Sequence, residues 1–343
     1  MNRTIENENI KNILVIRRNN AGDMICAIPV FRTLRKQFPD ASITVLADSS
    51  NAHVVRGASF IDNLLVYEKG EGIYSNKYIN YWRLFRENGT KFDLVIVLKV
   101  GFSSVSALIT LLSGARLRSG CLRGKWHPLW ACYNLPVKVH DVMRDMHAVD
   151  GYLEALRTIG IKEQVRDISI ETSPESRDRV RKFFEENNIR AAENVIVYNI
   201  SNNRPDNMWP PERFKETMRL LSENYSAIHI ISAVPSDREK GVALSSEMEN
   251  AFYFPENSKF MDFAALVEQS DLLICGEGGS MHIGASVHTP VISLWGGTSS
   301  VGNWMHRTEK QFMVKKGKHV TTISPSDIID VVIENNLLKG ANE

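Results

Sequence analysis

The sequence predicts an α/β protein of two doubly wound domains in tandem, and three observations support this fold class. Strand-like apolar runs alternate with helix-like segments from end to end, which is typical of parallel sheets joined by crossover helices. The length of 343 residues suits two domains of ordinary size. A polar stretch at residues 162–174 resembles an interdomain linker, so we expect domains at residues 1–170 and 171–343.

The first half opens with a strand, a loop and a helix. An apolar run at residues 13–16 predicts the strand, and the turn residues 19–22 predict the loop. The apolar periodicity that follows predicts one helix that ends near Phe38. Two further strands and a helix are expected in this half, at residues 43–47, 94–98 and 146–160.

The second half starts with a capped helix and then repeats the alternation. Ser173 is expected as the N-cap, Pro174 in the first turn and Glu175 beside the positive end of the helix dipole. Four strands and a terminal helix should follow, at residues 195–199, 228–232, 272–275, 291–295 and 324–338.

Composition and charge exclude several classes of protein. With 41 basic and 40 acidic side chains, the chain lacks the basic excess of a dedicated nucleic-acid binder. The polar N-terminus lacks the apolar core of a signal peptide, and no apolar run approaches the roughly 20 residues that cross a bilayer. The four cysteines show no CxxC spacing, which favours buried reduced thiols over a disulfide or metal framework.

The first candidate site is the loop at residues 17–23, directly after the first predicted strand. In doubly wound sheets, ligands bind beyond the carboxyl ends of the strands. Asp23 lies in this loop at the start of a helix. Spacing alone favours a helix cap or a first-turn dipole contact for Asp23, and leaves a chemical role as the alternative.

The second candidate site is CGEGGSMH at residues 275–282, which also follows a predicted strand. Glycines let the backbone approach a phosphate, and the start of the next helix carries partial positive charge. Neither a GxGxxG fingerprint nor a GxxxxGK[ST] loop is present, and glycine-rich turns are common, so this indication is weak by itself. His282 could donate to a phosphate or be a satisfied helix histidine.

The third candidate site follows the strand predicted at residues 195–199. Ser201, Asn202 and Arg204 come directly after that strand, where they could meet phosphates. Trp209 precedes two prolines that open the next helix, and we favour a packing anchor over a ligand platform for it.

These three sites, in this order, resemble the heptosyltransferase family of lipopolysaccharide synthesis, glycosyltransferase family nine. The segment ILVIRRNNAGDMICAIPVFRTLRKQFP resembles the family's strand, glycine-aspartate loop and proline-containing helix. DLLICGEGGSMHIGASVHTPVISLWGGT resembles its aspartate-threonine-glycine-x-x-histidine signature. FDLVIVLKVGFSSVSALITLLSGARLRSG, the helix beginning at His147 and WPPERF also match, so the resemblance spans residues 12 to about 300.

The resemblance implies a GT-B fold, in which two Rossmann-like domains face a cleft, and an inverting, metal-independent sugar transfer without a cofactor. Asp23 matches the position of the family's general base, which would deprotonate the acceptor hydroxyl. The donor, ADP-heptose by resemblance, would be held mainly by the C-terminal domain. The expected donor-binding residues are Ser201, Asn202, Arg204, Asn207, Asp237, Glu277, Gly278, Gly279 and His282.

The sequence departs from the family pattern at the donor site. The family usually has aspartate at the position of Glu277, threonine or serine at Gly278, and often lysine at Asn207. A member that uses another nucleotide sugar is therefore an alternative, and so is an inactive GT-B protein that only binds a nucleotide sugar or glycan. An epimerase or hydrolase of the same fold is a third.

A basic cluster in the first half, with Arg116 and His127 among its members, suggests the acceptor side. A lipopolysaccharide core, another acidic glycan or anionic headgroups of the inner membrane would suit such a cluster, although a solvated face is the commoner explanation. The expected acceptor-binding residues are Asn20, Arg118, Arg123 and Lys125. We expect a cytoplasmic monomer that contacts the cytoplasmic face of the inner membrane.

Overall fold

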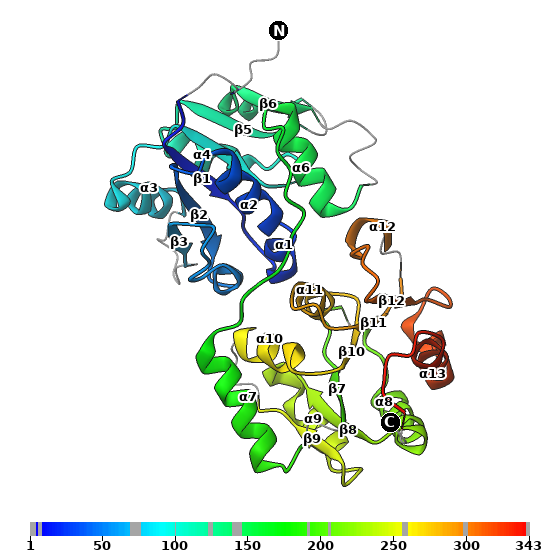
Figure 1. Cartoon of the computed structure of the whole chain (residues 1–343). Helices are drawn as coiled ribbons and strands as arrows, with labels where there is room; N and C mark the ends of the chain where they lie inside the picture. Colours follow the sequence, from blue (N-terminus) through cyan, green and yellow to red (C-terminus); the bar gives the residue numbers. More distant parts are fainter. Residues whose placement is uncertain are drawn as a thin grey trace. The chain divides into compact units, whose positions relative to one another are not determined.

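The chain folds as two compact units, each with its own parallel sheet. The computed structural model describes residue 5 and residues 9–68, 77–99, 101–122, 126–138, 146–190, 193–204, 207–255, 260–297 and 301–340. The N-terminal unit comprises Met1–Ile168 and Gly302–Trp304, and the C-terminal unit comprises Ser169–Val301 and Met305–Glu343. Each unit holds six parallel strands with helices packed on the sheet (Figure 1). The predicted α/β class with two doubly wound, Rossmann-like domains is confirmed.

The N-terminal sheet has the strand order β3-β2-β1-β4-β5-β6. Its strands are β1 (Asn12–Ile16), β2 (Ser42–Asp48), β3 (Asn63–Tyr67), β4 (Leu94–Val97), β5 (Leu117–Leu122) and β6 (Leu135–Lys138). The central strands β1 and β4 are continuous apolar runs with nearly every side chain buried, as a sheet covered on both faces requires. This explains why their positions could be predicted from the sequence.

Helices and short 3-10 turns accompany this sheet. The helices are α1 (Ala21–Ile25), α2 (Ile28–Gln37), α3 (Lys77–Asn88), α4 (Ser104–Leu112) and α6 (Ala148–Thr158), and the turns are η1 (Ala52–Val54) and η2 (Pro128–Cys132). α3, α4 and η2 share one apolar core with the sheet, whereas α2 packs on α6. The single helix predicted after β1 is wrong, because the chain forms two helices there. Pro29 lacks an N–H for an i→i−4 bond, so it suits the first turn of α2, which begins at Ile28, and not a continuation of α1.

The C-terminal sheet has the order β12-β11-β10-β7-β8-β9. Its strands are β7 (Asn194–Asn199), β8 (Ala227–Ser232), β9 (Ala251–Tyr253), β10 (Leu272–Gly276), β11 (Val291–Leu294) and β12 (Gln311–Val314). Its helices are α7 (Pro174–Glu186), α8 (Pro211–Asn224), α9 (Arg238–Ser245), α10 (Phe260–Glu268), α11 (Gly279–Ser286) and α13 (Pro325–Glu334), with η4 (Pro235–Asp237) and η5 (Val320–Thr322). The short helix α12 (Val301–Trp304) falls in this part of the sequence, but Gly302–Trp304 group with the N-terminal unit.

The expected helix caps of the C-terminal unit are confirmed. The Ser173 hydroxyl accepts from the Ser176 N–H at the start of α7, and Pro174 is the first helical residue. Ser324 and Asp327 form a capping box at the start of α13. Such caps satisfy backbone donors that a helix start leaves unpaired.

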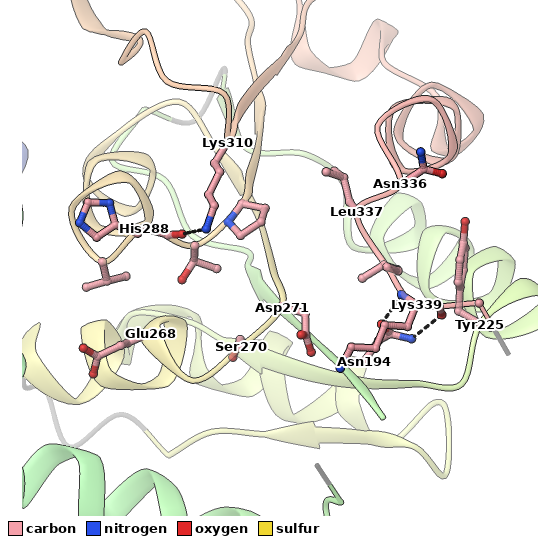
Figure 2. Close-up of a pocket in the computed structure, with 15 residues that line it drawn as sticks. Asn194, Tyr225, Glu268, Ser270, Asp271, His288, Lys310, Asn336, Leu337 and Lys339 are labelled. Carbon is pink, nitrogen blue, oxygen red and sulfur yellow. Dashed lines mark hydrogen bonds between the residues drawn. The ribbon is translucent and has the colours of Figure 1, made fainter. Parts of the chain in front are cut away.

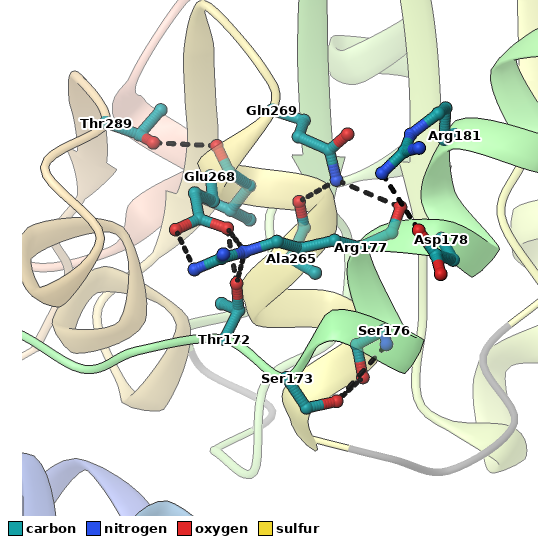
Figure 3. A network of polar contacts seen from close by, with 11 residues as sticks. Thr172, Ser173, Ser176, Arg177, Asp178, Arg181, Ala265, Glu268, Gln269 and Thr289 are labelled. Atoms are coloured by element: carbon teal, nitrogen blue, oxygen red, sulfur yellow. Dashed lines mark hydrogen bonds and ion pairs between the residues drawn. The ribbon is translucent and has the colours of Figure 1, made fainter.

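Polar contacts hold α7, and Thr172 just before it, against α10. The Arg177 guanidinium pairs with the Glu268 carboxylate at 3.0 Å, and Thr172 donates to the same carboxylate (Figure 3). Arg179 and the Ser176 hydroxyl both bind Asp262, which is almost fully buried. The chain is therefore held firmly where it enters the C-terminal unit.

Three smaller expectations can be compared with the structure. All four cysteines are buried and none is in a disulfide, as predicted. Trp209 is buried, packs edge-on against Phe214 and donates to the Ile323 carbonyl at 3.1 Å, which confirms the packing anchor. In the part of the chain that the structure describes, no helix has the length and apolar character needed to span a membrane.

Candidate active site

Each sheet has one topological switch point, and the candidate residues lie there. In the N-terminal sheet the strand order reverses between β1 and β4, and in the C-terminal sheet between β7 and β10. Loops that leave the carboxyl ends of such strand pairs diverge and leave room for a ligand. Asp23 follows β1, Ser201 follows β7, and Glu277 follows β10.

Asp23 is held by a buried arginine. It is the third residue of α1, and its side chain is 15% exposed. Arg17 Nη2 lies 2.8 Å from Asp23 Oδ2, while the Arg17 side chain is only 6% exposed. Arg17 Nη1 donates to the Leu98 carbonyl at 3.0 Å, so this one side chain connects the loops after β1 and β4.

Asp23 is not the helix cap that its spacing suggested. The N-cap of α1 is Asn20, and no side chain accepts a capping bond there. Asn20 is exposed, and its Nδ2 donates to Asp23 Oδ2 at 3.5 Å. Asp23 remains in the first turn, where its charge suits the helix dipole. The carboxylate itself is thus not used to cap the helix.

The loop before α1 is clamped to the end of β2. Asp48 accepts from Arg18 Nε at 3.1 Å and from the Asn19 N–H at 3.2 Å. Asn51 Nδ2 donates to the Arg17 carbonyl at 3.3 Å. Asn19 has a φ of 84°, a left-handed conformation that asparagine tolerates better than most residues. These contacts fix the backbone that carries Arg17 and Asp23.

Two titratable neighbours of Asp23 stay neutral. Burial, reinforced by the Asp23 carboxylate, raises the pKa of the Cys26 thiol. Burial also raises the pKa of the Tyr152 hydroxyl, whose ring lies 5.6 Å from the Arg17 guanidinium carbon. Because neither side chain is ionised at neutral pH, neither competes with Asp23 as a base.

Glu277 is the centre of the candidate donor site. Its side chain is nearly buried, and Oε2 accepts from Asn207 Nδ2 at 2.8 Å and from Arg204 Nη1 at 3.3 Å. Asn202 Nδ2 donates to the Glu277 carbonyl at 2.8 Å. The structure therefore joins the loops after β7 and β10 through four residues that the sequence had singled out separately.

Two glycines beside Glu277 have physical reasons to be glycine. A Cβ on Gly276 would lie 2.8 Å from Asn202 Nδ2 and 3.1 Å from the Asn207 carbonyl oxygen. Gly278 has a φ of 155° with a ψ of −154°, a combination that is essentially restricted to glycine. A threonine or serine would be strained at Gly278 in this conformation. Gly279, the first residue of α11, is exposed.

Ser201 and Asp237 form a second polar pair at the same edge of the sheet. The Ser201 hydroxyl donates to Asp237 Oδ2 at 2.9 Å, and Lys240 Nζ lies 2.7 Å from Asp237 Oδ1. The bond from Lys240, with help from that of Ser201, lowers the pKa of Asp237. Asp237 therefore presents a stable negative charge.

His282 has a protein partner. Its Nδ1 lies 2.8 Å from His306 Nε2, and both rings are buried. This arrangement agrees with the satisfied histidine that was the alternative to a phosphate donor. A contact between His282 and a phosphate stays a prediction.

The acceptor candidates are only partly described. Arg118 Nε donates to the Cys132 carbonyl at 2.7 Å and its Nη1 to the Ala115 carbonyl at 2.8 Å. These bonds hold the Arg118 side chain against the backbone and connect β5 with η2. Arg123 and Lys125 lie outside the described residues.

Arg17 and Gly276 lie within the candidate segments but were given no role of their own from the sequence, and Gly296 was not among the candidates. A Cβ on Gly296 would lie 2.7 Å from the Val320 nitrogen and 3.2 Å from Asn207 Oδ1, so this glycine makes room for the asparagine. All three stand at or just beyond the carboxyl end of a predicted strand, and that position was the available signal.

A pocket in the C-terminal unit lies at the other edge of its sheet. Asn194 begins β7, Asp271 precedes β10 and Lys310 precedes β12, so the lining comes from the amino ends of the strands (Figure 2). Lys310 Nζ donates to the His288 carbonyl at 2.9 Å. The pocket is therefore separate from the loops that carry the candidate donor site.

Comparison with known proteins identifies the family of the chain. Residues 81–318 match the profile of glycosyltransferase family 9 (heptosyltransferase), a range that begins after Asp23. The chain is 22% identical over 330 residues to lipopolysaccharide heptosyltransferase 3 of Escherichia coli (strain K12), covering 90% of this chain and 93% of the relative. It is 23% identical over 300 residues to a putative glycosyltransferase of Haemophilus influenzae, covering 83% of this chain and 82% of that one.

Solved structures show the same fold. A glycosyl transferase family 9 protein from Veillonella parvula superposes with a TM-score of 0.82 at 20% identity, covering 95% of this chain and 97% of the other. The E. coli heptosyltransferase WaaC, solved with ADP-2-deoxy-2-fluoro heptose, gives 0.75 at 16% identity, covering 94% and 99%. The GT-B fold is confirmed. The chain belongs to glycosyltransferase family 9 and is a glycosyltransferase.

Proposed function

We propose that the protein transfers a heptose from ADP-heptose to a lipopolysaccharide core or a related bacterial glycan, with inversion at the anomeric carbon and without a metal ion or other cofactor. Family membership and the heptosyltransferase names of its relatives support the sugar. The WaaC structure solved with an ADP-heptose analogue supports the nucleotide. The observation that carries the proposal is the Asp23 carboxylate, fixed by Arg17 at the switch point of the N-terminal sheet.

In this proposal Asp23 is the general base. Its carboxylate takes the proton of the acceptor hydroxyl as that oxygen attacks the anomeric carbon of the donor. The bond between the anomeric carbon and the diphosphate breaks, and ADP leaves from the opposite face, which inverts the configuration. Arg17 is a positioning residue, because its bonds to Asp23 and to the Leu98 carbonyl hold the carboxylate in one orientation.

The leaving ADP is stabilised by groups of the C-terminal unit. The start of α11 supplies backbone N–H groups and partial positive charge, and within the described residues no side chain caps this helix. Asn202 lies in the neighbouring loop and adds a donor, because its Nδ2 carries a second N–H beside the one given to the Glu277 carbonyl. The hydroxyl proton of Ser201 is already donated to Asp237. These groups take the place of a divalent cation, so chelation should leave transfer unchanged.

A family member that uses a different nucleotide sugar is the second candidate. Asn207 donates to Glu277 at 2.8 Å, but unlike a lysine it brings no positive charge to the carboxylate. Arg204 also reaches Glu277, through a side chain that is 65% exposed. A donor pocket with this charge balance could favour a sugar other than heptose.

One assay tests the proposal and its alternatives. The purified protein is incubated with ADP-heptose and heptose-deficient lipopolysaccharide, with and without EDTA, and the product is analysed by mass spectrometry and NMR. We expect heptosylated product of inverted configuration and ADP release that requires acceptor and tolerates EDTA. ADP release without acceptor would instead identify a hydrolase, and turnover only with another sugar in a donor screen would identify the second candidate.

The proposal also includes the partners and the place of action. A nucleotide sugar and a glycolipid or glycan are the substrates, and the enzyme acts as a monomer at the cytoplasmic face of the inner membrane. Gel filtration coupled to light scattering checks the monomer.

A further inference from the structure

The N-terminal unit exposes apolar side chains on one set of neighbouring elements. Its described residues contain four exposed large hydrophobic side chains, and all four lie on α3, on α4 or directly before η2: Ile79, Trp82, Leu111 and Trp126. Trp126 is 75% exposed. The exposed large hydrophobics of the C-terminal unit are instead spread over separate elements, at Val234, Val242, Met313 and Ile333.

These elements form one layer. α3 packs on α4 and α4 packs on η2, and the buried residues Tyr81, Ile109 and Cys132 of the three elements belong to one core with the sheet. Figure 1 shows α3 and α4 with the same sheet. Exposed side chains on such elements point away from that sheet, so Trp82, Leu111 and Trp126 share the outer side of the layer. We call this the α3–α4 face.

The charges of this region are mostly positive. Residues 77–140, which include α3, α4 and η2, contain ten Lys or Arg residues and only two acidic residues, Glu87 and Asp93, in a chain whose formal net charge is only +1. On α3, the Arg86 guanidinium carbon lies 5.1 Å from the centre of the Trp82 ring, which places a cation directly beside an exposed tryptophan. Exposed tryptophans combined with arginines are typical of surfaces that lie in the headgroup region of a membrane.

We propose that the α3–α4 face docks on an anionic lipid bilayer. Trp82, Leu111 and Trp126 insert between headgroups, and the exposed Arg83 and Arg86 of α3 pair with lipid phosphates. A second copy of the chain is a less suitable partner for the α3–α4 face, because a two-fold interface would bring these cations against one another. The inference extends the proposed function by naming the surface that brings the enzyme to a membrane-anchored acceptor.

Vesicle co-sedimentation tests the proposal without donor or acceptor, so its failure is distinguishable from failure of the transferase proposal. The full-length protein is mixed with phosphatidylcholine vesicles with and without phosphatidylglycerol. We expect binding to the anionic vesicles that weakens with added salt. The double variant Trp82→Ser/Trp126→Ser should bind at least about tenfold more weakly, and Arg86→Gln about fivefold.

The matched control is Met313→Ser/Ile333→Ser, which removes two exposed apolar side chains of the C-terminal unit. It should bind vesicles like the wild type, and thermal melting should show that both double variants are folded. Equal binding by Trp82→Ser/Trp126→Ser, or equal binding to both kinds of vesicle, would overturn the proposal. A dimer that this variant dissociates, in a protein that ignores vesicles, would also overturn it and assign the face to a second copy.

Discussion

The two switch points of this chain are built from different chemistry. At the N-terminal one, a single buried cation fixes a single carboxylate, through the 2.8 Å contact of Arg17 with Asp23. At the C-terminal one, amide side chains and glycines surround Glu277, and most contacts involve backbone atoms or neutral donors. We infer from this difference that the N-terminal switch point accepts the proton of the acceptor and the C-terminal switch point binds the nucleotide.

The largest effect on the transfer rate is expected when the Asp23 carboxylate is replaced. Asp23→Asn keeps the size and shape of the side chain but removes the base. Transfer should fall about a hundredfold to ten-thousandfold, because general-base catalysis contributes that much. Steady-state rates measured by ADP release check this, and a rate within a few fold of wild type would remove Asp23 from the role of base.

Acid should destabilise the C-terminal unit through a buried histidine. His229 is bonded to the Tyr198 hydroxyl at 2.9 Å and the Ser222 hydroxyl at 2.8 Å, and burial lowers its pKa from 6.5 to about 4. Between these pH values the unfolded chain binds a proton that the folded unit does not, so stability present above pH 6.5 is lost as the pH falls towards 4. The loss between pH 7 and pH 5 is about 2 kcal/mol.

Urea unfolding of the C-terminal unit, followed at both pH values, measures this loss. His229→Gln should be less stable at neutral pH but should lack this component of the pH dependence. The same slope in the variant would assign the acid sensitivity to other groups.

Arg17 should matter less than Asp23 and in a recognisable way. Arg17→Met removes the cation beside the carboxylate, and we expect kcat to fall about tenfold to a hundredfold because the base loses its fixed orientation. The KM for the donor should change little, because the side-chain contacts of Arg17 are with Asp23 and the Leu98 carbonyl and not with the candidate donor site. Arg17→Lys should restore kcat in part. A loss of activity that only follows a loss of folded protein would make Arg17 merely structural.

The smallest effect is expected at Gly276. Its Cβ in Gly276→Ala would displace Asn202, so the KM for the donor should rise about tenfold while kcat changes little. Gly302→Ala, where a Cβ would meet no atom within 4 Å, is the matched control. An unchanged donor KM for Gly276→Ala would show that Asn202 is not needed in its present position.

Much of the fold could be predicted from the sequence, because the central strands are continuous apolar runs between helical segments. β1, β4, β7 and β10 were predicted to within about one residue of their ends. Strands farther from the centre, such as β9 with three residues, lack such a run. The break between α1 and α2 was missed because a proline near a helix start and one inside it look alike until packing is known.

The sequence predicted which residues belong to the candidate site better than it predicted their contacts. Asp23 and Glu277 stand directly after strands, and these strands can be recognised in the sequence as apolar runs. The contact between Arg17 and Asp23 depends on where a long side chain folds back, and the need for Gly276 depends on Asn202, which is far from it along the chain. Neither relation leaves a local pattern, so neither could be read before the structure.

Proton transfer and nucleotide binding should belong to different switch points of this chain. Calorimetric titration of ADP into the Asp23→Asn and Asn207→Ala variants tests this separation. We expect Asp23→Asn to bind ADP like the wild type and Asn207→Ala to bind it about tenfold more weakly, because Glu277 loses its 2.8 Å partner. Weakened binding in Asp23→Asn together with wild-type binding in Asn207→Ala would contradict it.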